Sequence, residues 1–364
     1  MASQVNLIEQ DIDEQIGQIR IDALDLSFGE IINLHKSKEF IIAPDFQRYF
    51  RWTQEQKSRL IESVLIELPI PQIFVIETET GVMELIDGLQ RVSSLIQFIE
   101  HTALEGLEPK EALRLSGCDL IRSLNDKLFN DLPMQLRLRL KRASVRTVII
   151  KRQSSAKLRY SMFKRLNTGG SLLSAQEIRN CTSRMAGNPG TRFYEFLRDL
   201  ASYESFKTCM EPLSETDRQE RADEELVLRF FALKNARELF KRSVRDWLDR
   251  YMEKVVLEEV GFDYDTERKN FNRLFDYLKN LLGAGAFVRY RDLRPTGALA
   301  PAYFEAVSMA VWNKIDVIEK VEASLIKEKI IAALQDEKFK EYIGPGANRP
   351  ALLASRIKFI EERL

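Results

Sequence analysis

The residues best suited to chemistry lie in one short segment, Ile86-Asp87-Gly88-Leu89-Gln90-Arg91. A β-rich run ends there and a helical pattern of apolar residues begins at once, which predicts a strand, a tight turn and a helix. The first turn of a helix presents backbone N–H groups and a positive dipole end to an anion. Gly88 lets the chain turn sharply and approach a ligand. Arg91, one turn into the helix, would direct a fork of donors at a phosphate.

Asp87 has three interpretations in this setting: an N-cap, a carboxylate beside a metal ion, or a base for a water molecule. Gln90, Ser93, Ser94 and Gln97 lie away from the apolar face of the helix and would line the same cleft. Taken alone, the segment favours the structural interpretation, in which Asp87 only caps the helix and Arg91 lies on the surface.

A second candidate loop, Asn167-Thr168-Gly169-Gly170, separates two predicted helices. Two glycines free backbone N–H groups to form an anion-binding concavity. Asn167 offers an oxygen suited to a hard cation, so it is the candidate metal ligand. A plain glycine stop, followed by a helix capped by Ser174 and Glu177, explains the same residues equally well.

The charges are balanced in number, 55 basic against 55 acidic residues, but not in position. The stretch 132–176 contains no Asp or Glu and eleven Lys or Arg residues. It forms either a solvated face paired with acidic segments elsewhere or a phosphate-facing surface for nucleotide, DNA or both. The candidate nucleic-acid contacts within it are Arg137, Arg139, Lys141, Arg142 and Arg146.

The elements that position these residues indicate an α+β protein. After a polar, acidic lead-in of about twenty residues, the patterns predict helices over 27–36, 53–68, 89–99, 156–166 and from 174 onward. Strands are predicted over 40–43, 72–76, 82–86 and 144–151. From about residue 191 the pattern is helical throughout. We therefore predict a mixed α and β domain over 1–186 and an α-helical domain over 187–364, with the seam at Gly187–Gly190.

Several classes of function are disfavoured. The sequence has no G-x-x-x-x-G-K-[ST] motif of a P-loop NTPase. No apolar run is long enough to span a bilayer, and the N-terminus lacks the pattern of a signal peptide. Three scattered cysteines fit a reducing cytoplasm rather than a disulfide framework. The two histidines are His35 and His101, so the second half has none.

Four segments occur in order: PDFQRYFRW, TQEQKSRLIESVLIELPIPQIFV, ELIDGLQRVSSL and FKRLNTGGSLLSAQEIRN. This series resembles the N-terminal domain of GmrSD-type restriction endonucleases over about residues 40–182. A looser resemblance, RADEELVLRFFAL over 221–233, extends it into the helical half. The chain departs from the family at Leu89, where a glutamine is usual. The resemblance implies a small mixed sheet in a ParB/sulfiredoxin-like fold that binds nucleotide phosphates at the strand-to-helix turn.

The resemblance also implies roles for individual residues. Asp87 and Arg91 would be catalytic in nucleoside triphosphate hydrolysis. Mg²⁺ and the nucleotide would be held by a set of polar residues and glycines: Gln47, Arg48, Gly88, Gln90, Ser94, Asn167, Thr168, Gly169 and Gly170.

Larger relatives carry a His-Asn-His nuclease, which needs histidines that residues 187–364 lack. We therefore expect a nucleotide-dependent regulatory or sensor subunit of a bacterial defence system that acts with a separate effector or nuclease. The alternatives are a non-enzymatic DNA-binding module that uses the basic stretch, and a protein-interaction scaffold. The sequence leaves self-association open.

Overall fold

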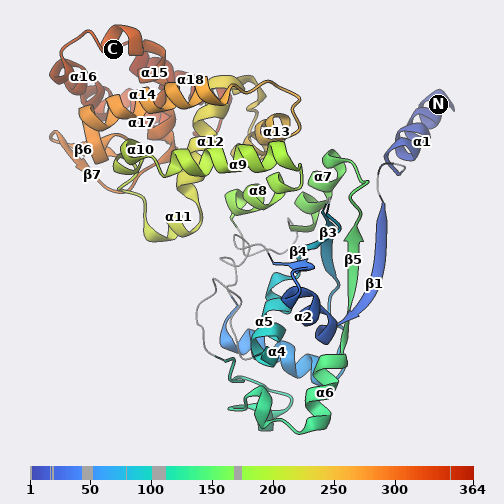
Figure 1. The fold of residues 1–364 in the computed structure, drawn as a ribbon. Coiled ribbons are helices and arrows are strands. Elements are labelled where there is room, and N and C mark those ends of the chain that lie inside the picture. Colours follow the sequence, from blue (N-terminus) through green and yellow to red (C-terminus); the bar gives the residue numbers. More distant parts are fainter. Residues whose placement is uncertain are drawn as a thin grey trace. The chain divides into compact units, whose positions relative to one another are not determined.

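The protein is described from a computed structural model, which covers residues 2–16, 18, 20–42, 52–78, 80–100, 112–167, 174–344 and 346–364. The chain divides into two compact units, Met1–Ser171 and Leu172–Leu364, and each is described by itself (Figure 1). The first unit carries a mixed sheet and the second is largely helical, so the predicted α+β class is confirmed. The boundary between the units and the predicted seam between residues 186 and 187 differ by one helix, α8 (Ala175–Arg184).

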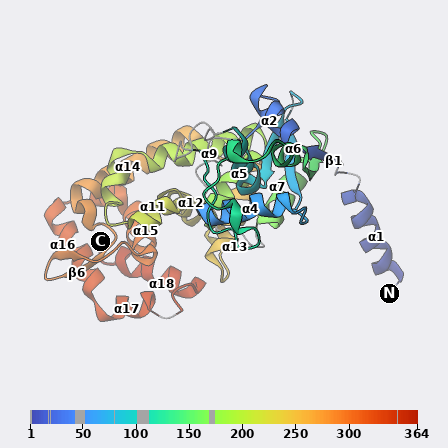
Figure 2. The same cartoon turned by 90° about the horizontal axis from the view of Figure 1, so that it is seen from below.

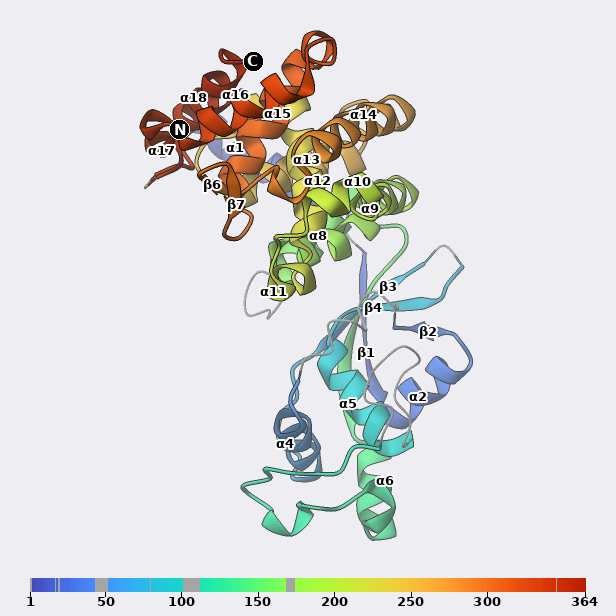
Figure 3. The same cartoon turned by 90° about the vertical axis from the view of Figure 1, so that its left-hand side faces the viewer.

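The first unit contains a five-stranded sheet with the strand order β1-β5-β3-β4-β2. Its strands are β1 (Ile21–Ser27), β2 (Phe40–Ile41), β3 (Ile73–Glu77), β4 (Met83–Asp87) and β5 (Ser144–Ile150). The β3–β4 hairpin is antiparallel and β2 runs parallel to β4 (Figure 3), whereas β5 runs parallel to β3 on the other side of the hairpin. Its helices are α1 (Ala2–Ile16), α2 (Phe28–Lys36), α4 (Gln54–Leu65), α5 (Leu89–Glu100), α6 (Met134–Arg142) and α7 (Ala156–Asn167), with 3-10 turns η1 (Arg122–Leu124) and η2 (Phe129–Asp131).

The predicted strands and helices of this unit are present, and the N-terminus needs a correction. The acidic lead-in forms the helix α1, and β1, which the sequence pattern does not predict, follows it. β1 pairs along its whole length with β5 at the edge of the sheet. Ile21 and Leu24 stay about half exposed there, so β1 lacks the buried apolar face that identifies other strands.

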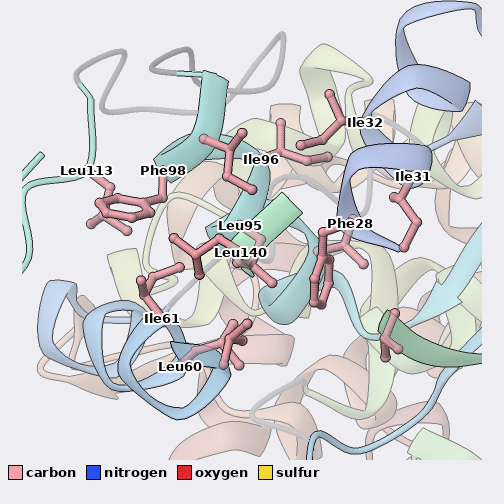
Figure 4. Close-up of a cluster of buried hydrophobic side chains, with 14 of the residues drawn as sticks. Phe28, Ile31, Ile32, Leu60, Ile61, Leu95, Ile96, Phe98, Leu113 and Leu140 are labelled. Atoms are coloured by element: carbon pink, nitrogen blue, oxygen red, sulfur yellow. The ribbon is translucent and has the colours of Figure 1, made fainter. Parts of the chain in front are cut away.

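The core of the first unit lies between the sheet and the helices α2, α4, α5 and α6, which contact one another. Phe28 and Ile31 of α2 belong to the same cluster of buried side chains as Leu95 and Phe98 of α5, which Figure 4 shows. Ile73 and Val75 add the inner face of β3. Burying each such side chain stabilises the fold by about 1.5–3 kcal/mol. Because β4 and α5 both contribute side chains to this core, the core holds both ends of the β4–α5 connection in place.

The second unit is a helical assembly with an aromatic core around Phe230, Phe271 and Phe275, whose rings lie 4.3–6.1 Å apart. A two-stranded hairpin, β6 (Arg289–Arg291) with β7 (Arg294–Thr296), is its only sheet among the residues described. Figure 2 shows β6 beside α16, which it contacts.

The second unit contains the following helices and 3-10 turns: α8 (Ala175–Arg184), α9 (Asn188–Ala201), α10 (Glu204–Cys209), α11 (Glu215–Gln219), α12 (Ala222–Asn235), η3 (Arg237–Leu239), α13 (Val244–Val256), α14 (Tyr264–Leu282), η4 (Gly283–Gly285), α15 (Pro301–Ile318), α16 (Ala323–Gln335), α17 (Glu337–Ile343) and α18 (Pro350–Glu361). In the described part of the chain, no helix combines the length and apolarity that crossing a bilayer requires.

Candidate functional site

The turn between β4 and α5 has the predicted strand-turn-helix form. β4 ends at Asp87 and α5 begins at Leu89. The N–H of Val92 donates to the carbonyl of Gly88 at 3.0 Å, so Gly88 rather than Asp87 occupies the cap position. Gly88 has a φ of 103°, and a Cβ there would lie 2.4 Å from Cγ2 of Ile73. Only glycine fits this turn without displacing β3.

Asp87 and Arg91 form an ion pair across this turn. The Nη2 group of Arg91 donates to Oδ2 of Asp87 at 3.3 Å and to the carbonyl of Gln72 at 3.0 Å. The Asp87 side chain is 37% exposed and that of Arg91 18%, so the carboxylate stays accessible while the guanidinium is largely covered. The Nε group of Arg91 is buried and has no hydrogen-bond partner within the described residues. Arg91 therefore joins the ends of β3, β4 and α5 and retains an unused donor.

Gln90 connects this turn to the segment that precedes α4. Its side-chain carbonyl accepts a hydrogen bond from the backbone N–H of Trp52 at 3.1 Å. Trp52 packs against the core of the first unit. Gln90 thus positions the end of PDFQRYFRW at the first turn of α5.

The polar residues farther along α5 are buried rather than exposed in a cleft. The Ser94 hydroxyl donates to the carbonyl of Gln90 at 2.6 Å and is inaccessible to solvent. Gln97 is also buried and accepts a hydrogen bond from Nζ of Lys57 at 3.3 Å. We call Lys57, Gln90, Ser94 and Gln97 the polar seam between α4 and α5.

Lys57 is a candidate that the sequence interpretation missed. It is 7% exposed, and burial lowers the pKa of its ammonium group. Its position carries a signal, because Lys57 precedes Leu60, Ile61 and Val64 at the spacing of a buried helix face. A lysine on an apolar stripe is a functional candidate for that reason.

Several predicted site residues lie outside the described residues. Gln47 and Arg48 belong to this group, as do Thr168, Gly169 and Gly170. Asn167 is the last residue of α7. The capping box at the start of the next helix is confirmed, because Ser174 accepts from the N–H of Glu177 and Glu177 accepts from the N–H of Ser174.

The chemistry of Asp87 fits a Mg²⁺ ion that also binds phosphate oxygens. Such ions are held in proteins by one or two carboxylates together with the phosphates and water. One oxygen of Asp87 faces Arg91 and the side chain remains partly exposed. No group of three or more His, Cys, Asp or Glu residues forms a metal site within the described part of the chain, so the nucleotide itself would have to complete the coordination.

The basic stretch forms α6, β5 and α7, and its charges are only partly free. Arg139 donates to the carbonyl of Leu65 at 3.1 Å, and Arg146 pairs with Asp25 at 3.3 Å. Lys141 and Arg142 are exposed at the end of α6, whereas Arg137 is half-buried. DNA binding by this stretch stays a prediction.

Comparison with known protein families identifies the family to which the segment around the β4–α5 turn belongs. Residues 28–183 match the family model described as GmrSD restriction endonuclease, N-terminal domain. This segment is a GmrSD N-terminal domain. The match includes the β4–α5 turn and the polar seam, and it extends through most of α8. The protein is accordingly related to restriction systems. No curated protein and no solved structure matches the chain.

Proposed function

We propose that the GmrSD-type domain binds a nucleoside triphosphate with Mg²⁺ at the β4–α5 turn and hydrolyses it. We propose further that the protein is a regulatory or sensor subunit of a bacterial restriction system and acts with a separate effector. The observation that carries the proposal is the turn itself, which combines a glycine at positive φ, a helix N-terminus, an accessible Asp87 and an Arg91 with an unused donor.

The contacts of the turn suggest a division of roles. The first-turn amides of α5 and the guanidinium of Arg91 would neutralise phosphate oxygens. Asp87 would hold Mg²⁺ or orient the attacking water, and its ion pair with Arg91 would keep the carboxylate in place. Gln90 would hold Trp52, two residues before α4, beside the nucleotide. The ParB-like fold implied by resemblance supports the same location. Three buried cysteines, Cys118, Cys181 and Cys209, fit a cytoplasmic protein.

The test compares wild type with Asp87→Ala and Arg91→Ala in two assays, nucleotide-dependent thermal shift and phosphate release with Mg²⁺. At a nucleotide concentration 100 times Kd, binding should stabilise the wild-type protein by about 2.7 kcal/mol. Both variants should lose that shift, and hydrolysis should fall on the order of 100-fold, the lower end of what acid–base residues contribute.

The first unit supplies a matched control. Asp25 and Arg146 form an ion pair of the same residue types and the same 3.3 Å distance, far from the turn in sequence. Asp25→Ala and Arg146→Ala should leave the nucleotide-dependent shift and the hydrolysis rate unchanged. If all four variants respond to nucleotide as wild type does, the β4–α5 turn is not a nucleotide site.

A further inference from the structure

The β6–β7 hairpin of the second unit has two chemically different faces. Arg289 pairs with Thr296, Tyr290 with Pro295, and Arg291 with Arg294. Residues that face each other across an antiparallel pair point to the same side, and neighbours along a strand point to opposite sides. Arg289, Arg291 and Arg294 therefore share one face, and Tyr290 and Pro295 share the other.

The face with Tyr290 is held against the helical unit. The Tyr290 hydroxyl donates to the carbonyl of Gly285 at 2.9 Å, and burial raises the pKa of this phenol to about 12. A Cβ on Gly285 would lie 2.3 Å from that hydroxyl and 3.3 Å from Cβ of Pro295. The close approach at Gly285 fixes which face of the hairpin is turned outward.

The outward face keeps its arginines exposed and unneutralised. All three are exposed, and within the described residues none of them has a carboxylate in ion-pair distance. Arg289 also hydrogen-bonds to the side chain of Tyr303 on α15, so Arg291 and Arg294 are the pair at the outer end of the hairpin. Asp292, in the turn, likewise makes no ion pair there. Arg291 and Arg294 lie directly opposite each other, an arrangement that destabilises a strand pair because the like charges repel. A bound polyanion would remove that repulsion.

The tip of the hairpin carries an exposed leucine and has an unusual backbone conformation. Asp292 and Leu293 both have positive φ, 49° and 64°, in a two-residue turn where Asn and Gly are the usual residues. Leu293 is 67% exposed. A leucine that lies in the left-handed region and is mostly exposed is suited to contact something outside this chain.

We propose that the β6–β7 hairpin is a binding site for duplex DNA. A two-stranded ribbon fits a DNA groove, and arginines two residues apart, about 6–7 Å, can contact neighbouring phosphates. Arg289, Arg291 and Arg294 contact the phosphate backbone, while Leu293 enters the groove as an apolar wedge of the kind that other groove-binding proteins use. The site belongs to the second unit, whereas the β4–α5 turn belongs to the first, and DNA binding here needs no nucleotide.

The test measures binding of the full chain to a labelled 20-base-pair duplex by fluorescence anisotropy, without nucleotide, over a series of salt concentrations. In Arg291→Ala/Arg294→Ala, affinity at 0.1 M salt should fall on the order of 50-fold, because each arginine bound to a phosphate contributes about 0.9 to the log–log salt slope. The slope itself should become shallower by about 0.9 for each arginine removed. Leu293→Ala should weaken binding several-fold with an unchanged slope.

Two further variants separate binding from folding and from general charge. Arg294→Glu places a carboxylate opposite Arg291, so it should keep or raise the thermal midpoint while it abolishes DNA binding. Arg242→Ala/Arg250→Ala removes two exposed arginines elsewhere in the same unit and should leave the affinity within twofold of wild type.

Either of two results would overturn the proposal. The first is a hairpin double variant that binds DNA as tightly as its control. The second is wild-type protein that binds polyglutamate as tightly as DNA and loses both ligands equally in the variants, which would assign the hairpin to an acidic polypeptide instead.

Discussion

The role of Gly88 follows from two independent restrictions on the same residue. Its φ of 103° is unfavourable for any residue with a Cβ, and the space that a Cβ would occupy is filled by Ile73. Gly81, in the β3–β4 hairpin, shares only the first restriction, since its φ is 83° and nothing lies within 4 Å of its hypothetical Cβ. Comparing substitutions at the two glycines therefore separates the cost of backbone strain from the cost of steric overlap.

We predict that Gly88→Ala lowers the free energy of unfolding by about 2–4 kcal/mol, the sum of backbone strain and overpacking against β3. Gly81→Ala should cost only about 1–2 kcal/mol, the strain alone. Urea unfolding of both variants and wild type measures the difference. Equal losses in the two variants would mean that β3 moves freely away from the turn.

At the residue scale, the sequence is informative where chemistry and backbone conformation are local. Asp87, Gly88 and Arg91 are identified from six consecutive residues, and the structure brings their groups together. The third partner of Arg91, the carbonyl of Gln72, is 19 positions away and carries no signal in its residue type. The sequence pattern predicts that Ser94 lines a cleft, but helix geometry directs its hydroxyl to the carbonyl one turn earlier.

Among the elements of the second unit, a chain of buried ion pairs joins five helices. Asp249 of α13 accepts from Arg179 of α8, which also donates to Glu225 of α12. Arg229 of α12 then donates to both Glu225 and Glu305, and Arg356 of α18 completes the chain at Glu305 of α15. The six residues alternate in sign and sum to zero charge.

Removing one cation from this chain should be costly because it leaves carboxylates buried without their partner. We predict that Arg179→Met lowers the free energy of unfolding by about 3–5 kcal/mol. Arg250→Met, on the exposed face of α13 beside Asp249, should change it by less than about 0.5 kcal/mol. Chemical unfolding followed by circular dichroism measures both losses. If Arg179→Met loses as little stability as Arg250→Met, the buried ion pairs do not contribute to stability as proposed.

The contribution of Glu225 to the stability of the fold depends on pH in a direction that its ion pairs determine. Burial opposes ionisation of its carboxyl group, but the charges of Arg229 and Arg179 outweigh it and lower the pKa below the ordinary 4.5. A lowered pKa in the folded state stabilises the fold above the unfolded pKa, and this stabilisation is lost as the pH falls through the folded value. The contribution should therefore be constant near neutrality and shrink in acid.

We predict that the stability difference between wild type and Glu225→Gln is constant from pH 7 to about pH 5 and decreases below about pH 4.5. Urea titrations at a series of pH values give the difference directly. Glu215→Gln, at an exposed position on α11, serves as the comparison and should show little difference at any pH. A pH-independent difference for Glu225→Gln would show that its ion pairs do not determine its ionisation.

Whether a helix, a strand or a contact between helices can be predicted also depends on how close together in the sequence the residues that determine it lie. The capping box at Ser174–Glu177 is complete within four residues and is confirmed, and the box at Thr53–Gln56 at the start of α4 is equally local. β1 escapes prediction because its stability comes from pairing with β5, more than a hundred positions away, without a buried apolar face. The partners in the ion-pair chain are 46 to 76 positions apart where they join different helices. The segment RADEELVLRFFAL contains only two of its members, Glu225 and Arg229, and carries no signal for their partners.

For the stability of the whole molecule, the most important feature is that each of the two units has its own core. Leu95 is fully buried in the core of the first unit, and Leu274 is fully buried in the second. The three tryptophans of the chain divide in the same way, Trp52 in the first unit and Trp247 and Trp312 in the second. Length and pattern predict two domains, but the boundary between the compact units comes before α8 because that helix pairs its charges with α12 and α13.

We therefore predict that each unit unfolds according to its own core. Leu95→Ala, which should cost about 2–5 kcal/mol, should lower the urea midpoint reported by Trp52 in a Trp247→Phe/Trp312→Phe background. The same substitution should leave the midpoint reported by Trp247 and Trp312 unchanged in a Trp52→Phe background. Leu274→Ala should produce the opposite result. If either leucine variant shifts both reporters equally, the chain unfolds as one cooperative body, and the boundary between residues 171 and 172 divides the packing but not the stability.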